Sequence, residues 1–140
     1  MSLAKLARAS GTHAAFAFLA MGGWALFANR AHGAAALGPA LVQSALSGGI
    51  TIVLKRALEA LVARLDGLLA YVLPPLATAS VILATLAGVH LAIGTPEIVA
   101  TIAVPWSVST LYAIVYSAVL AQDRQDQDRQ DQDRQDWGRR

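Results

Sequence analysis

The sequence predicts an all-α integral membrane protein with four transmembrane helices arranged as two hairpins. Hydrophobic residues make up 56% of the 140 residues and charged residues only 14%, whereas a globular protein carries about 25% charged residues. Six aspartates and five arginines lie after Ala121, which leaves only nine charged residues in the first 121 positions. Several apolar stretches there contain no charged residue at all. Crossing the hydrocarbon core takes about 20 mainly apolar residues in a helix, and four stretches meet this requirement. We therefore expect the solvent of this chain to be a lipid bilayer.

The four predicted spans cover about residues 12–29, 34–54, 74–93 and 98–121, after a cytoplasmic N-terminus of residues 1–11. The third span is expected to begin at Pro74 and Pro75, because a proline has no N–H group to satisfy at a helix start. Pro105 is expected to kink the fourth span. A secretory signal peptide over residues 5–28 is the alternative for the first span, but no small-x-small cleavage site precedes Arg30.

The distribution of cations predicts the orientation. Ten of the eleven Lys and Arg residues lie in the N-terminus, in the segment between the second and third spans, or in the tail, and only Arg30 lies on the opposite side. Cationic loops stay in the cytoplasm, so both termini are expected there, in a bacterial-type inner (plasma) membrane. Because the cations lie at span ends and not on one face with aromatic residues between them, no nucleic-acid partner is expected. The absence of cysteine excludes disulfides and thiolate chemistry.

Two segments outside the spans have distinctive compositions. Residues 55–69 are amphipathic, and the linker of residues 55–73 is predicted to contain a helix lying at the membrane interface, with a partner-docking helix as the alternative. Residues 122–136 repeat Gln-Asp-Arg-Gln-Asp three times, and Trp137 follows. The repeat contains no apolar residue and cannot bury a core, so residues 122–140 are expected to be a disordered tail, with an electrostatic tether as the alternative.

Polar and small residues recur along the second and fourth spans at helical spacing. Such faces let membrane helices pack closely and hydrogen-bond to one another, so we expect helix contact there. A narrow polar pathway lined by the second and fourth helices is the alternative. The residues concerned are Gln43, Ser44, Ser47, Gly48, Thr51, Thr101, Ser109, Tyr112 and Tyr116.

A second polar group is predicted at the outer face, from Arg30, His32, His90 and Glu97. Arg30 is expected to act as an interface anchor, Glu97 to favour a helix N-terminus, and His90 to hydrogen-bond between helices. Two histidines and a glutamate can also hold a divalent metal, and a membrane enzyme or metal site is the weakest alternative. No cofactor and no metal are expected.

These features predict a small, non-enzymatic, polytopic membrane protein. No acidic or basic residue lies near the middle of a span, which is evidence against proton-coupled carriers, because intramembrane ionisable groups mark such pathways. We expect a self-associating helical bundle or an accessory subunit of a membrane complex, with the lipid bilayer and a second copy or a complex subunit as partners. Gly48→Leu is expected to disrupt the assembly. A small channel or carrier for an uncharged or weakly polar solute or a lipid is the alternative.

Overall fold

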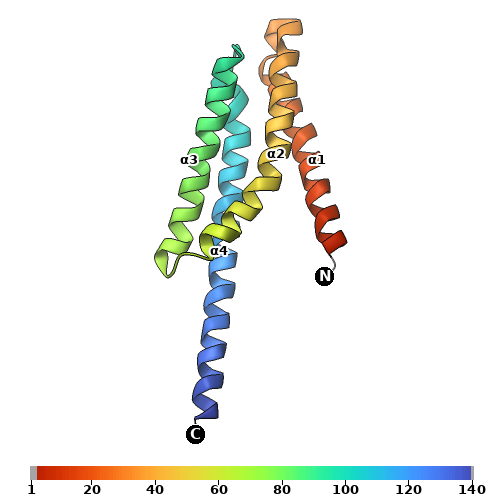
Figure 1. Cartoon of the computed structure of the whole chain (residues 1–140). Helices are drawn as coiled ribbons and strands as arrows, with labels where there is room; N and C mark the ends of the chain where they lie inside the picture. The colour runs from red at the N-terminus through yellow and green to blue at the C-terminus, as the bar shows by residue number, and fades with distance from the viewer. Residues whose placement is uncertain (1–2, 140) are drawn as a thin grey trace.

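The structure, a computed structural model, describes residues 3–139, with side chains from Gly11 onward. The elements are α1 (Leu3–Ala28), a short 3-10 segment η1 (Arg30–Ala36), α2 (Leu37–Val62), α3 (Leu68–Ala92) and α4 (Ile98–Gly138), as Figure 1 shows. Within the described residues there is no strand, and four helices are long and apolar enough to cross a membrane. The predicted all-helical fold class, with four helices long and apolar enough to span a membrane, is thus confirmed.

The helices pack unevenly around a small core. α1 contacts mainly α2, and α3 contacts mainly α4, while the contacts between these two pairs are fewer. Many large apolar side chains face outward, among them Phe16, Leu41 and Val99, which are 71%, 68% and 79% exposed. Such a surface suits a lipid solvent. The buried core consists of Leu54, Leu58, Ile82, Leu86, Ile102 and Ala113.

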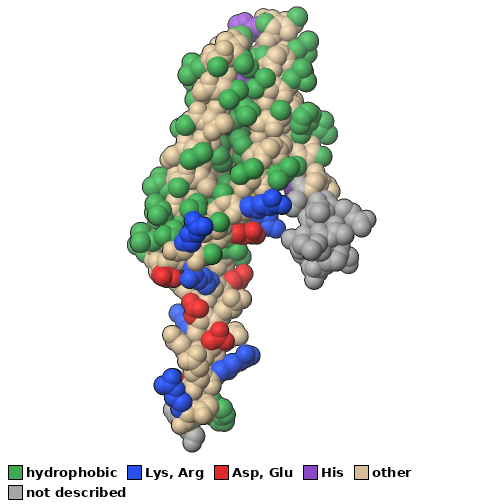
Figure 2. All heavy atoms as spheres, viewed as in Figure 1, with side chains coloured by type: hydrophobic (Ala, Val, Ile, Leu, Met, Phe, Trp, Pro, Cys, Tyr) green, Lys and Arg blue, Asp and Glu red, His purple; other side chains and the backbone are tan. Residues whose placement is uncertain are grey.

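The bundle has two ends that differ in character. We call the end formed by residues 29–36 and 93–97 the distal end, and the end formed by residues 63–67 the basal end. Both termini point toward the basal side, and α1 diverges from the other helices toward its N-terminus (Figure 1). Figure 2 shows that Lys, Arg, Asp and Glu gather at the basal end and along the last part of α4, whereas the visible face above them is largely apolar. The side chains of Lys5 and Arg8, used above for the orientation, lie outside the described ones.

α3 ends in a hydrogen-bonded turn that fixes the position of Thr95. The backbone N–H of Gly94 donates to Leu91 O at 3.2 Å, and that of Thr95 donates to His90 O at 3.0 Å. Gly94 has a φ of 66°, which a residue without a Cβ adopts at no steric cost. This is the Schellman pattern of helix ends, and it brings Thr95 back beside His90.

The segment predicted as a separate interfacial linker is divided between two helices. α2 continues without interruption to Val62, and α3 begins at Leu68, six residues before Pro74. The reason is packing, since Val62, Ala70 and Ala121 form a second buried cluster that joins the end of α2 and the start of α3 to the side of α4. The two prolines therefore lie inside α3, and the predicted helix start at Pro74 is wrong.

The predicted disorder of residues 122–140 is not confirmed, because α4 continues as one helix to Gly138. Its first turn beyond the bundle is held by Arg124, whose guanidinium donates to Val62 O at 2.8 Å and Leu65 O at 3.0 Å. Arg124 also lies 3.3 Å from the Asp66 carboxylate. Beyond this junction, Asp and Arg recur three and four residues apart, a spacing that favours helix through opposite charges on one face.

Candidate functional site

Asn29 joins the end of α1 to the start of α4 at the distal end. Its side chain is fully buried. The amide donates to Ala25 O at 2.9 Å and to Thr101 Oγ1 at 2.7 Å, and its oxygen accepts a bond of 3.0 Å from the Glu97 N–H. Because the first N–H groups of a helix have no partner within it, Asn29 supplies an acceptor that the start of α4 would otherwise lack.

His90 joins α3 to α2 and is also fully buried. The ring Nε2 lies 2.9 Å from Gln43 Oε1, and Nδ1 lies 2.7 Å from Thr95 Oγ1. Gln43 Nε2 donates to Ser47 Oγ at 2.8 Å, which leaves Gln43 Oε1 as the acceptor. The neutral imidazole therefore carries its proton on Nε2, and Nδ1 accepts from the Thr95 hydroxyl. Both ring nitrogens are engaged within the bundle.

The four residues predicted as an outer-face cluster do not form one group. His32 Nε2 lies 3.2 Å from Glu97 Oε1 at the exposed surface, while His90 faces Gln43 and Thr95. Arg30 stacks over the Phe27 ring at 4.0 Å and donates to Phe27 O at 2.9 Å. In the described part of the chain, no three His, Asp or Glu side chains are arranged to hold a metal ion.

The polar face of α2 is turned into the bundle. Gln43, Ser44 and Ser47 are buried, and Ser44 lies so close to α1 that a Cβ added at Gly22 would overlap its hydroxyl. A Cβ added at Gly48 would meet Ala14 O at 3.6 Å and the Phe18 side chain at 3.7 Å, both on α1. Gly48 therefore faces a neighbouring helix of the same chain and not the outside.

Four of the predicted face residues line one cleft, which extends along the middle of the bundle and has His13 and Lys55 on its basal side. This space, which we call the basal cleft, has a volume of about 360 Å³ and lies between α1, α2 and α4, with one contact from α3. Its volume falls within the ~300–1,000 Å³ of small-molecule sites. The lining residues are His13, Phe16, Ala17, Met21, Ser47, Ile50, Thr51, Ile52, Leu54, Lys55, Leu86, Pro105, Val108, Ser109 and Tyr112.

The remaining predicted residues on α4 lie on either side of this cleft. Tyr112 and Tyr116 stack with their ring centroids 5.3 Å apart, and the Tyr116 hydroxyl donates to Glu59 Oε1 at 2.8 Å. Thr101 lies at the distal end, fully buried, where its hydroxyl donates to Glu97 O at 2.6 Å. The face predicted on the fourth span is thus divided between two places.

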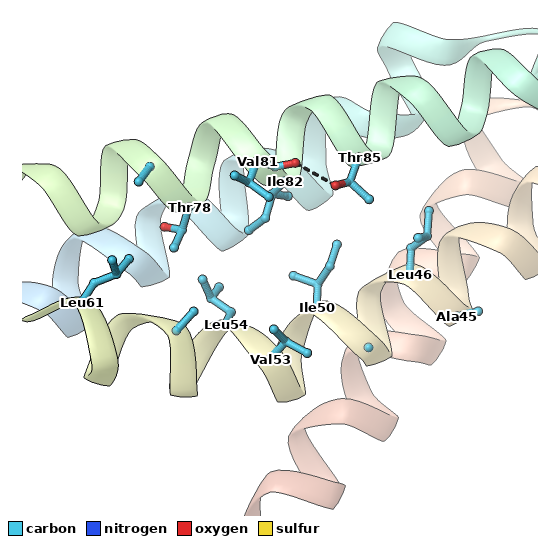
Figure 3. A pocket seen from close by; sticks show the side chains of 13 residues that line it. Ala45, Leu46, Ile50, Val53, Leu54, Leu61, Thr78, Val81, Ile82 and Thr85 are labelled. Atoms are coloured by element: carbon cyan, nitrogen blue, oxygen red, sulfur yellow. Dashed lines mark hydrogen bonds between the residues drawn. The ribbon is translucent and has the colours of Figure 1, made fainter.

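A larger space lies between α2 and α3. This α2–α3 groove has a volume of about 620 Å³. In Figure 3 the side chains of Ile50 and Leu54 on α2 point toward α3, and that of Ile82 on α3 points toward α2. Its two threonines bond to carbonyls of their own helix, Thr78 to Pro74 O and Thr85 to Val81 O, each at 2.8 Å. Its wall therefore offers no unsatisfied hydroxyl proton and is apolar in effect.

Small residues on the α2 side of this groove follow helical spacing, with Ala45 and Gly49 one turn apart and Ala57 about two turns beyond. Ala45, Gly49 and Ala57 all belong to the lining, and a Cβ added at Gly49 would meet no atom within 4 Å. The sequence reasoning missed this face, because it attributed the packing role to Gly48. The available signal was the small-x3-small spacing of Ala45 and Gly49, which is typical of helix contacts in membranes.

Comparison with known proteins yields no relative from which a role can be carried over. No family model matches the chain, and neither the curated proteins nor the solved structures contain a match.

Proposed function

We propose that this chain is a small, non-enzymatic, polytopic protein of a bacterial-type inner membrane that acts through helix assembly. In this proposal it is a self-associating bundle or an accessory subunit of a membrane complex. The observation that carries the proposal is the open apolar α2–α3 groove, about 620 Å³ in volume, between two helices of the same chain.

The composition of the groove favours a helix as its occupant. Helices in a bilayer associate through close packing, because lipid tails are as apolar as the side chains. Ala45 and Gly49 permit a close approach of a second backbone, and nothing in the chain lies within 4 Å of a Cβ at Gly49. Self-association through this surface would be isologous, with Ala45 and Gly49 of the two copies meeting across a two-fold axis.

The contacts of the ionisable residues support a non-enzymatic role. Among the side chains that the structure describes, His90 is the ionisable one that is fully buried, and both of its ring nitrogens bond to neighbouring side chains. His32 and Glu97 meet at the exposed distal surface, without a third His, Asp or Glu among the described side chains to complete a metal site. In this proposal, His90, His32 and Glu97 stabilise the contacts between helices and take no part in catalysis.

The orientation proposed for the chain places the basal end and both termini in the cytoplasm. Lys55, Arg56 and Arg64 lie near the basal end, and the arginines of the tail follow α4 on the same side. Arg30 is the single cation at the distal end. This asymmetry agrees with the rule that short cationic loops remain in the cytoplasm.

The test of the assembly proposal is a tagged purification from native membranes in mild detergent, read by native mass spectrometry. A homo-oligomer identifies self-association, and a stoichiometric foreign subunit identifies an accessory role. Gly49→Leu should dissociate either assembly and leave the chain as a free monomer, because the larger side chain fills the α2–α3 groove. Gly23→Leu is the matched control, since a Cβ at Gly23 also meets nothing within 4 Å but lies on α1. An unmodified chain that is monomeric and without partners contradicts the proposal.

The second candidate function is a carrier for a weakly polar solute or a lipid, and the basal cleft is the observation that favours it. The cleft gathers Ser47, Thr51, Ser109 and Tyr112 from α2 and α4. Thr51→Val or Tyr112→Phe should change the flux of the solute in liposomes. A flux no greater than that of empty vesicles across a broad panel of solutes would refute this function.

A further inference from the structure

The basal cleft is polar at one end and apolar along the rest of its length. α1 runs from the basal to the distal end, whereas α2 and α4 run from the distal to the basal end (Figure 1). The lining residue nearest to the basal end is therefore His13 on α1, Lys55 on α2 and Tyr112 on α4. Phe16, Met21 and Ile50 line the part farther from the basal end. An amphiphile with one charged end and one hydrocarbon chain has this distribution of polarity.

Two of the four hydroxyl groups of the cleft donate within their own helix and therefore add little polarity to its wall. The Thr51 hydroxyl donates to Ser47 O at 2.8 Å, and the Ser109 hydroxyl donates to Pro105 O at 2.8 Å. Each of these protons is thus satisfied within its own helix. The wall consequently suits a hydrocarbon chain better than a solute that needs hydrogen-bond donors.

The N–H donors at the mouth of the cleft can bind an anion. The Lys55 ammonium group lies 3.9 Å from Glu59 Oε1, at the limit of an ion pair, and it has three N–H donors. Glu59 does not line the cleft, and its Oε1 also accepts the Tyr116 hydroxyl. The imidazole of His13 keeps at least one N–H donor in either protonation state. Lys55 and His13 together can therefore bind a phosphate group.

We propose that the basal cleft binds one acyl chain of an anionic phospholipid, with the phosphate held by Lys55 and His13. An acyl chain that leaves the bilayer for the cleft moves from one apolar medium to another. It therefore gains packing contacts but little hydrophobic free energy, and the headgroup decides which lipid is bound. Cations next to an anionic membrane surface attract such headgroups. This inference deepens the second candidate function, because it names a lipid as the ligand. It rests on that function only in placing the ligand in the basal cleft.

The test compares phosphatidylglycerol with phosphatidylcholine of identical acyl chains, added to the delipidated, purified full chain and read by native mass spectrometry. The unmodified chain should retain phosphatidylglycerol in preference. Lys55→Gln should lower its retention by clearly more than the roughly fivefold that one cation near the surface contributes without a specific contact. Arg56→Gln is the matched control, because it removes the same charge at an exposed residue that does not line the cleft. An equal loss in both variants would mean a general surface charge effect and overturn the proposal.

A second pair of variants tests the position of the acyl chain. Ala17→Leu fills the cleft and should lower the retention of phosphatidylglycerol, whereas Ala15→Leu adds the same volume at an exposed residue outside the lining and should not. Circular dichroism of each variant verifies that the helices are retained. If Ala17→Leu retains phosphatidylglycerol as the unmodified chain does, the acyl chain is not in this cleft.

Binding and transport are separable in this design. Selective retention of phosphatidylglycerol with neither lipid movement between leaflets nor solute flux supports the inference and refutes the carrier function. Solute flux without selective retention refutes the inference and leaves the carrier function supported.

Discussion

The His90 imidazole on α3 donates to Gln43 Oε1 on α2 across 2.9 Å, and the two residues are 47 positions apart in the chain. Both side chains are fully buried, so this bond links the two helix pairs out of contact with solvent. Gln43 in turn donates to Ser47, and Thr95 completes the bonding of the ring. Polar groups buried in this way are stabilising only while each keeps its partner.

The first prediction concerns this pair. In a double-mutant cycle of Gln43→Ala and His90→Ala, the two side chains should show a favourable coupling of about 0.6–1.7 kcal/mol, the range found between helices in a membrane. The measurement is the free energy of unfolding by SDS in mixed micelles. A coupling of zero within error would mean that the bond does not contribute to stability.

The second prediction concerns the contact of α1 with α2. Gly22→Ala should destabilise the chain by about 1–3 kcal/mol, the usual cost of overpacking, because the new Cβ overlaps the Ser44 hydroxyl. Gly23→Ala, next to it, meets no atom within 4 Å and should leave stability unchanged or slightly raise it. Adding Ser44→Ala to Gly22→Ala should recover part of the loss. Equal effects of the two single alanine variants would contradict the packing of α1 on α2 described above.

The third prediction concerns the start of α4. Asn29→Ala removes the acceptor of the Glu97 N–H and the donor to Thr101, so amide hydrogen exchange at residues 97–101 should become faster. An unsatisfied buried group costs about 1–3 kcal/mol. His32→Ala should have a much smaller effect, because its contact with Glu97 is at the exposed surface, where such pairs contribute little. Exchange that is as slow in Asn29→Ala as in the unmodified chain would contradict this role.

The fourth prediction concerns the junction of the tail with the bundle. Arg124→Ala should lower the free energy of unfolding by about 1 kcal/mol, because two charge-assisted bonds to the end of α2 are lost from a side chain that solvent partly screens. Arg129→Ala changes the same position of the next repeat, where the side chain is exposed. It should have no measurable effect on SDS unfolding. A loss of similar size in both variants would show that the repeat acts as one charged segment and not through Arg124.

The apolar helices could be predicted because composition alone separates a 20-residue apolar span from the rest of the chain. The second span was expected to end at residue 54, yet α2 continues to Val62, since Leu58 and Val62 are buried against other helices. Amphipathicity indicates that one face of such a segment is covered, but not whether lipid or protein covers it. The helical tail was missed because the absence of apolar residues was given more weight than the spacing of Asp and Arg.

The individual contacts of the site could be predicted only in part. The burial of Gln43 and Ser47 followed from their place on a polar helix face, but the bond from Gln43 to His90 depends on how α2 and α3 are rotated toward each other. The role of Gly22, Gly48 and Gly49 depends in the same way on where α1 crosses α2. Successive residues of a helix are rotated by about 100° around its axis. A pair of neighbouring glycines in the sequence therefore does not tell which of the two faces a partner helix.

The most direct test of the proposed assembly is oxidative cross-linking of single-cysteine variants in native membranes. The chain has no cysteine, so each disulfide can be attributed to the introduced residue. Gly49→Cys lies in the α2–α3 groove and should form a disulfide-linked dimer across the two-fold axis, whereas Gly48→Cys, which faces α1, should not. A dimer from Gly48→Cys alone, or none from either variant, would contradict self-association through the groove.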